Sequence, residues 1–110
     1  MNLKKVVRAL SVRQPYAEQI LRGTKKIEYR SIPTKIRERV YIYASKKRAR
    51  FDAKAEREKF ATGVLIGTVE IVDCRLRNGE YHWHLARPRR LAKLLKPRHQ
   101  PQPVWFHPFD

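Results

Sequence analysis

Acidic residues are scarce in this chain of 110 residues. It carries 10 Asp and Glu against 26 Lys and Arg, which gives a formal net charge of +16 at pH 7 with neutral histidines. Self-repulsion at this charge density opposes folding, so the surplus indicates a polyanionic partner, and nucleic acid is the expected one. An acidic membrane surface is disfavoured because no basic amphipathic helix with bulky aromatic anchors is apparent.

Cysteine and long apolar runs are scarce as well. The single Cys74 excludes a disulfide framework, and it is expected to be a buried, reduced thiol. No apolar run approaches the roughly 20 residues of a membrane span, and the basic first ten residues are too charged for a secretory signal. We therefore expect a cytoplasmic protein with one domain over residues 1–110, and we assume a monomer.

Metal ligands are also few. His82 and His84 alternate along one strand face, whereas His99 and His107 lie further along the chain. No cysteine pair or cluster of acidic residues accompanies them, so the sequence predicts neither a metal site nor a cofactor.

Residues 11–30 carry the densest set of structural signals. Ser11 has the side chain of a helix N-cap, and Pro15 suits a first helical turn. Gly23 provides the left-handed residue that commonly ends a helix. The sequence therefore predicts a helix over this stretch with a narrow apolar stripe at Tyr16, Ala17, Ile20 and Leu21.

A short charged strand is expected directly after this helix. In strict alternation Lys26, Glu28 and Arg30 lie on one face. Lys25 would then lie on the opposite face, and it converges with Glu28 only if it sits in the turn that Gly23 allows. A short helix that leads into a charged strand indicates a functional cleft beneath that helix.

These same residues resemble a known family. The pattern S-x-x-Q-P-Y-A from Ser11 and the run G-T-K-K-I-E-Y-R ending at Arg30 resemble the ASCH domain family, whose signature reads G-x-K-x-x-E-x-R. The resemblance continues through residues 63–74 and the run P-V-W-F-H-P-F. It implies an α+β fold, a small PUA-like β-barrel of about five or six strands with two or three short helices, and a role with RNA or DNA. It also implies that Lys25, Glu28 and Arg30 are the functional positions.

The family includes small amidohydrolases that deacetylate a modified cytidine, and this chain departs from them at one position. Those members use a threonine nucleophile three residues beyond the lysine, where this chain has Glu28. Thr24 precedes the lysine and is misplaced for the same role. The departure argues against this amidohydrolase activity.

Further elements follow from local patterns. Residues 39–44 predict a strand with Tyr41 and Tyr43 on one face, and residues 63–74 a central strand that bends at Gly67. Asn78 and Gly79 predict a hairpin turn. Glu70 either points outward or faces the cleft. Strands are also expected at 6–10, 81–85 and 104–106, a second helix from residue 45 to about 60, and one or two helical turns within 89–96.

Aromatic and basic residues together suggest how a nucleic acid would be held. Aromatic rings stack on unpaired bases, and cations contact phosphates, which favours RNA over DNA as the target. Tyr43 and Trp83 are the expected stacking platforms. The residues expected to contact nucleic acid are Arg13, Gln14, Lys25, Lys26, Glu28, Arg30, Tyr43, Trp83, Arg87, Arg89 and Arg90.

Two other functions use the same residues. A metal-independent ribonuclease needs a base, an acid and cations around the phosphate, and Lys25, Glu28 and Tyr43 would then be its catalytic groups. A protein-interaction adaptor would instead turn the basic surface towards an acidic protein partner.

Overall fold

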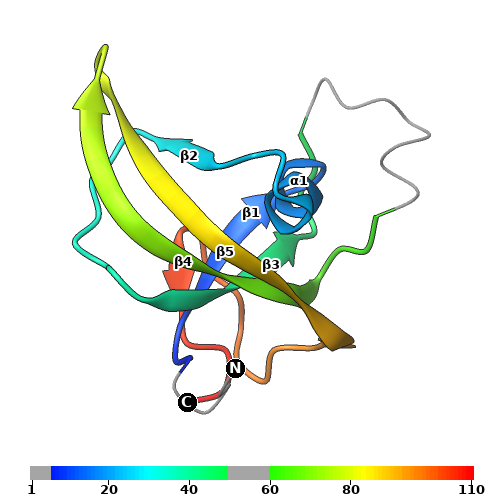
Figure 1. Cartoon of the computed structure of the whole chain (residues 1–110). Coiled ribbons are helices and arrows are strands. Elements are labelled where there is room, and N and C mark those ends of the chain that lie inside the picture. Colours follow the sequence, from blue (N-terminus) through cyan, green and yellow to red (C-terminus); the bar gives the residue numbers. More distant parts are fainter. Residues whose placement is uncertain (1–5, 50–59) are drawn as a thin grey trace.

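The computed structural model describes residues 6–49 and 60–110, which fold around a six-stranded mixed sheet (Figure 1). The strand order is β2-β5-β4-β3-β1-β6, and every neighbouring pair is antiparallel except β1 with β3. The elements are β1 (Ala9–Arg13), α1 (Tyr16–Arg22), β2 (Ile27–Arg30), β3 (Arg39–Ser45), β4 (Val64–Arg77), β5 (Glu80–Leu95) and β6 (Trp105–Phe106).

The predicted start of the first helix is wrong. Ser11 lies inside β1, opposite Tyr43 of β3, and its hydroxyl donates to the carbonyl oxygen of Gln102. The parallel pairing with β3 continues to Arg13, so the first strand covers residues 9–13 and not 6–10. The helix begins at Tyr16. Its predicted end is confirmed, because Gly23 has φ 82° and caps the last turn.

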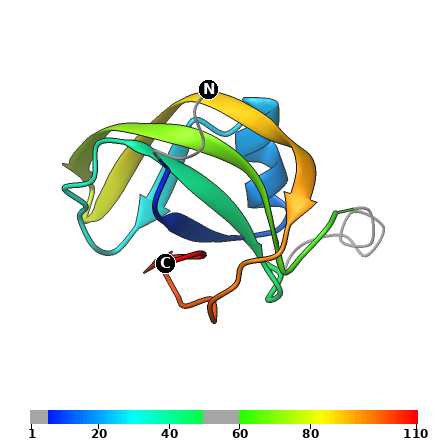
Figure 2. The same ribbon diagram turned by 90° about the horizontal axis from the view of Figure 1, so that it is seen from below.

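The alternation predicted for residues 39–44 is confirmed by two separate apolar clusters. Val40, Ile42 and Ala44 pack with the buried side chains of α1, Ala17, Ile20 and Leu21, inside the curl of the sheet (Figure 2). Tyr41 and Tyr43 pack in a second cluster on the other face of β3, with Phe106 and Leu91 among its buried members. Both faces of β3 are therefore buried, as expected of a central strand.

β4 and β5 form one long hairpin. Its turn is the predicted one, because Asn78 and Gly79 have φ 51° and 81°, which are the positive values of a tight hairpin turn. β5 continues through residues 89–95, so the helical turns expected there are wrong. In the strand, Leu91 and Leu95 pack in the second apolar cluster while Lys93 is exposed, and Arg89, Arg90 and Leu95 pair with β4.

The bend predicted at Gly67 is confirmed by the strand register. The pairing shifts next to Gly67 on both sides, between Ile42 and Tyr43 of β3 and between Leu65 and Gly67 against β5. A Cβ atom at Gly67 would lie 2.2 Å from Cδ1 of Leu21. The absence of a side chain therefore lets α1 pack directly on β4.

The sheet is open in the described part of the chain, because its two edge strands, β2 and β6, do not pair with each other. Side chains cross the gap instead. Nη2 of Arg30 donates to the carbonyl oxygen of Ser11 at 2.8 Å, and Trp83 stacks on Trp105 with ring centroids 5.7 Å apart. A small α+β domain is observed, whereas a closed barrel is not.

α1 is the one helix among the described residues, and no helix there is long and apolar enough to cross a membrane. The second predicted helix falls mainly on residues 50–59, which lie outside the described part. Its expected start is wrong, because Ser45 is the last residue of β3 and the next four residues are not helical.

Candidate nucleic-acid cleft

A cleft of about 700 Å³ opens where β1, the start of α1, β2 and the end of β3 come together. Its wall on one side is formed by residues 100–104, which run back towards β1. Among the described residues its lining contains four cations, Arg13, Arg30, Lys46 and Lys47, and one carboxylate, that of Glu28. The cleft is therefore a positively charged groove with aromatic side chains, Tyr16 and Tyr43, in its lining.

Glu28 is the buried charge at the centre of this arrangement. Only 7% of the residue is exposed, and its carboxylate lies 2.9 Å from Nε and 2.8 Å from Nη2 of Arg30. Nζ of Lys25 lies 3.5 Å from its other oxygen. Two cations thus compensate one buried carboxylate, which is the arrangement that makes such burial tolerable.

Lys25 reaches this carboxylate from the turn before β2, as the prediction required. Its ammonium also lies over two rings, 5.3 Å from the centroid of Tyr16 and 4.9 Å from that of Tyr29. Cation–π attraction and the ion pair together fix its position.

Arg30 serves both the charge cluster and the sheet. Its guanidinium pairs with Glu28, donates to the backbone of Ser11 and lies 5.6 Å from the centroid of Trp83. Because planar guanidinium groups hold several acceptors in fixed directions, this one residue joins β2 to β1 at the floor of the cleft.

A family model for the ASCH domain matches residues 10–95, which covers most of the chain. The chain belongs to the ASCH domain family. The match contains the whole helix, the Lys25–Glu28–Arg30 cluster and both long strands, so the predicted membership is confirmed. No curated protein sequence matches the chain.

In this ASCH domain the cleft offers cations without an ion partner among the described residues. The exposed Arg13, Lys46 and Lys47 line it, and none of them has a carboxylate within ion-pair distance in the described part of the chain. Lys46 and Lys47 were not predicted. They follow β3 within a long basic run, and nothing in that run distinguishes them from their neighbours before the strand end is known.

Gln14 does not line the cleft, contrary to the prediction. It is 1% exposed, its Nε2 donates to the carbonyl oxygen of Ala61, and its Oε1 accepts from the backbone N–H of Glu18. Both ends of the amide are occupied, so Gln14 connects the start of α1 to the segment before β4.

Trp83 is not a stacking platform. Its side chain is fully buried, with Trp105 stacked on it and its Nε1 donating to the carbonyl oxygen of Ile32. Tyr43 does line the cleft, although it is 4% exposed and packs edge-on against Phe106. Burial raises the pKa of Tyr43, so its phenol stays protonated at neutral pH and is a hydrogen-bond donor, not a base.

The three arginines predicted from β5 lie outside the cleft. Both nitrogens at the tip of Arg90 pair with the carboxylate of Glu18 at 3.0 and 2.8 Å, which raises the pKa of Arg90. Arg87 forms an ion pair with Glu70, and the exposed Arg89 pairs in register with Thr68 of β4. Glu70 thus pairs with β5 and β3 cations and does not join Glu28.

No group of three or more His, Cys, Asp or Glu side chains converges to hold a metal ion among residues 6–49 and 60–110. His82 lies 3.5 Å from Glu80 and packs edge-on against Tyr29 on β2. Neither His82 nor His84 lines the cleft.

Proposed function

We propose that this ASCH domain binds single-stranded nucleic acid, RNA in preference to DNA, in the cleft around Glu28 and Arg30. The observation that carries the proposal is the cleft lining itself, in which three exposed cations surround a fixed floor of Arg30 and Glu28. Exposed cations attract phosphates, whereas the fixed carboxylate accepts hydrogen bonds from the amino edge of a base.

Aromatic side chains give the cleft a face for a base. Tyr16 lies in its wall, and Lys25 lies over both the Tyr16 ring and the ring of the exposed Tyr29. Stacking of an unpaired base on an aromatic ring contributes about 1–3 kcal/mol and is available only in single strands. This favours single strands over duplexes and, with them, RNA loops and ends.

The curl of the open sheet is consistent with the PUA-like barrel that the family resemblance implies. The Arg30 to Ser11 hydrogen bond connects β2 to β1, which are not neighbours in the sheet. The cleft lies at this junction, and we propose the junction as the ligand site.

Salt dependence of binding tests the cleft directly. If its four cations contact phosphates, the logarithm of affinity for a fluorescent single-stranded RNA should fall against the logarithm of salt concentration with a slope of about −3. Arg13→Ala should reduce that slope by about 0.7, because it removes one exposed cleft cation.

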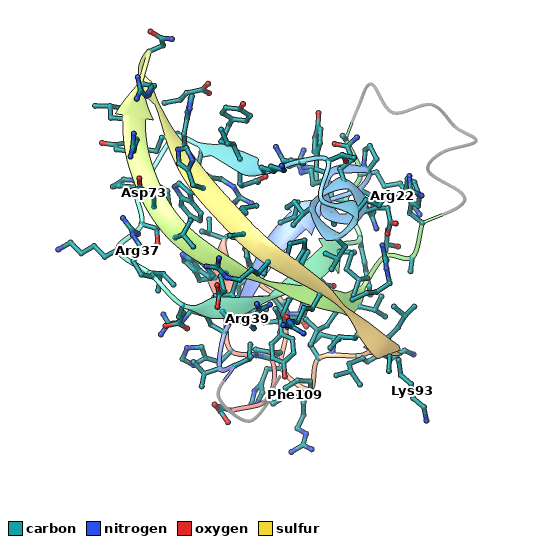
Figure 3. The ribbon with its side chains drawn as sticks, in the orientation of Figure 1. Arg22, Arg37, Arg39, Asp73, Lys93 and Phe109 are labelled. Atoms are coloured by element: carbon teal, nitrogen blue, oxygen red, sulfur yellow. The ribbon has the colours of Figure 1, made fainter. Side chains whose placement is uncertain are left out.

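Lys93→Ala is the matched control. Lys93 is an exposed cation near the end of β5, projects away from the sheet (Figure 3) and is not part of the cleft. If Arg13→Ala and Lys93→Ala weaken binding equally, total charge alone governs affinity and the proposal fails. A slope near zero would favour the acidic protein partner.

Incubating labelled RNA with the protein in the presence of EDTA distinguishes a metal-independent ribonuclease from a binding domain. Cleavage that disappears in Lys25→Ala would make this cleft catalytic, since Lys25 contacts the buried Glu28 carboxylate. Intact RNA together with Lys25-dependent binding would support a binding domain.

A further inference from the structure

A second, smaller cavity of about 260 Å³ lies between the end of α1, the start of β2 and the middle of β5. Its floor is apolar, whereas its rim is basic, with Lys25, Lys26 and Arg87 and no acidic side chain among the lining residues that the structure describes. The apolar lining residues are Ile20, Val69, Leu85, Ala86 and Pro88.

The cavity exists because β5 bulges away from β4 at this point. Glu70 pairs with Ala86 and Thr68 with Arg89, so Arg87 and Pro88 on β5 face a single β4 residue. Arg87 takes φ 51° there, and proline has no N–H to complete the ladder. The local opening is lined beneath α1 by Ile20, Val69 and Leu85, which are 1%, 1% and 7% exposed.

Lys25 joins this cavity to the first cleft. It lines the cavity, and its ammonium lies over the ring of Tyr16, which lines the cleft. The ring centroid of Tyr29, a residue that is 49% exposed, lies 4.9 Å from the same ammonium. Lys25 and these two rings form a cluster, the ridge, that contributes Tyr16 to the cleft lining and Lys25 to the cavity lining.

We infer that the second cavity takes a nucleobase of the same strand that occupies the first cleft, so that the strand crosses the ridge at Tyr29. This inference rests on the proposed function. The apolar floor contacts the faces of the base, and Lys26, which is exposed and has no ion partner in the described part of the chain, contacts its phosphate. A free phosphate would leave the apolar floor unused, and an apolar peptide would leave Lys26 without a counter-charge, since Lys25 and Arg87 already pair with Glu28 and Glu70.

Filling the cavity tests the inference. Ala86→Phe places a ring in its lining, whereas Ala92→Phe adds the same ring at an exposed position of the same strand, outside both openings. Affinities are measured by anisotropy for labelled oligouridines of about two to about ten nucleotides, a range that brackets known site sizes. Thermal melting checks that each variant folds.

Wild-type protein and Ala92→Phe should gain affinity with length and then level off. Ala86→Phe should bind the longer strands with about tenfold lower affinity, the contribution of one base contact, and should bind the shortest strands with unchanged affinity. If Ala86→Phe does not fold, Lys26→Glu replaces it, with the exposed Lys96→Glu as control.

Loss confined to longer strands supports the inference. Equal affinity of variant and control at every length overturns it and leaves the first cleft intact as the binding site. Absence of binding by wild-type protein at every length overturns the proposed function instead.

Discussion

Replacing Arg30 by alanine is expected to lower the free energy of unfolding by about 2–4 kcal/mol. The change removes two nitrogen contacts to Glu28, the hydrogen bond to the carbonyl oxygen of Ser11, and the cation over Trp83. Above all, it leaves a carboxylate whose side chain is 10% exposed with Lys25 as its one remaining ion partner in the described part of the chain.

The magnitude follows from burial. Removing one partner of a fully buried ion pair costs about 3–5 kcal/mol, because the remaining charge is uncompensated. The Arg30 side chain is 19% exposed, and Lys25 stays 3.5 Å from Glu28, so the expected cost is somewhat lower. Against a typical total stability of about 5–15 kcal/mol, the variant remains folded but melts early.

Urea denaturation followed by tryptophan fluorescence measures the effect. Arg75→Ala is the matched control, because Arg75 pairs with Asp73 at the same two-residue spacing on a strand, with side chains 57% and 39% exposed. An exposed pair contributes about 0–1 kcal/mol. If Arg30→Ala and Arg75→Ala destabilise equally, the reasoning from burial is refuted.

The double variant Glu28→Gln/Arg30→Ala tests the cause of the loss. Removing the carboxylate together with its partner should destabilise less than the sum of the two single changes, by about 1–3 kcal/mol. Additivity within about 0.5 kcal/mol would show that Glu28 and Arg30 do not interact.

Three further predictions concern other parts of the structure. Gly67→Ala should destabilise the protein by about 1–3 kcal/mol in urea melts, because its Cβ would lie 2.2 Å from Leu21 and 2.5 Å from a β5 backbone oxygen; an unchanged midpoint would contradict the close packing of α1. Burial raises the pKa of Glu18, but its hydrogen bonds and ion pairs with Arg90 and Arg22 together lower the pKa by more, so that it lies below 4.5. The stability from this pair is therefore present above about pH 4.5 and lost as pH falls through the lowered pKa, and the gap between wild type and Arg90→Ala should close on acidification; a gap independent of pH would exclude the pair as its cause. Ultraviolet titration of wild type against Tyr43→Phe should show the Tyr43 phenol ionising above pH 10, because burial raises its pKa; ionisation at or below 10 would mean that Tyr43 is solvated.

Features of the fold that depend only on neighbouring residues could be predicted from the sequence. The alternation in β3, the Asn78-Gly79 turn and the helix end at Gly23 depend on side-chain period or positive φ, and all three are observed. The convergence of Lys25 with Glu28 was also predicted, because a lysine in the turn before a strand is released from the alternation.

Features that depend on residues far away in the sequence could not be predicted. Ser11 has the chemistry of a helix cap, but parallel pairing with β3 keeps it in a strand. Residues 89–95 have basic residues and flanking prolines that resemble a short helix, yet pairing of Arg89, Arg90 and Leu95 with β4 makes the stretch part of a strand.

Some of the residues predicted to contact nucleic acid lie outside the cleft for the same reason. Gln14 and Trp83 are polar and aromatic residues of the expected types, but partners far along the chain bury them. Arg90 lies outside the cleft because it pairs with Glu18, which is 72 residues away in sequence. Conversely, Lys46 and Lys47 reach the cleft only because β3 ends beside it.

The far wall of the cleft carries a consequence for selectivity. Gln100, Pro101, Gln102, Pro103 and Val104 form that wall, yet the family match ends at residue 95. The charged floor therefore lies within the residues that the family model matches, whereas the wall that faces it lies outside them. If the cleft takes a nucleic-acid strand as proposed, substitutions in residues 100–104 should change which strand is preferred while leaving the Glu28–Arg30 pair in place.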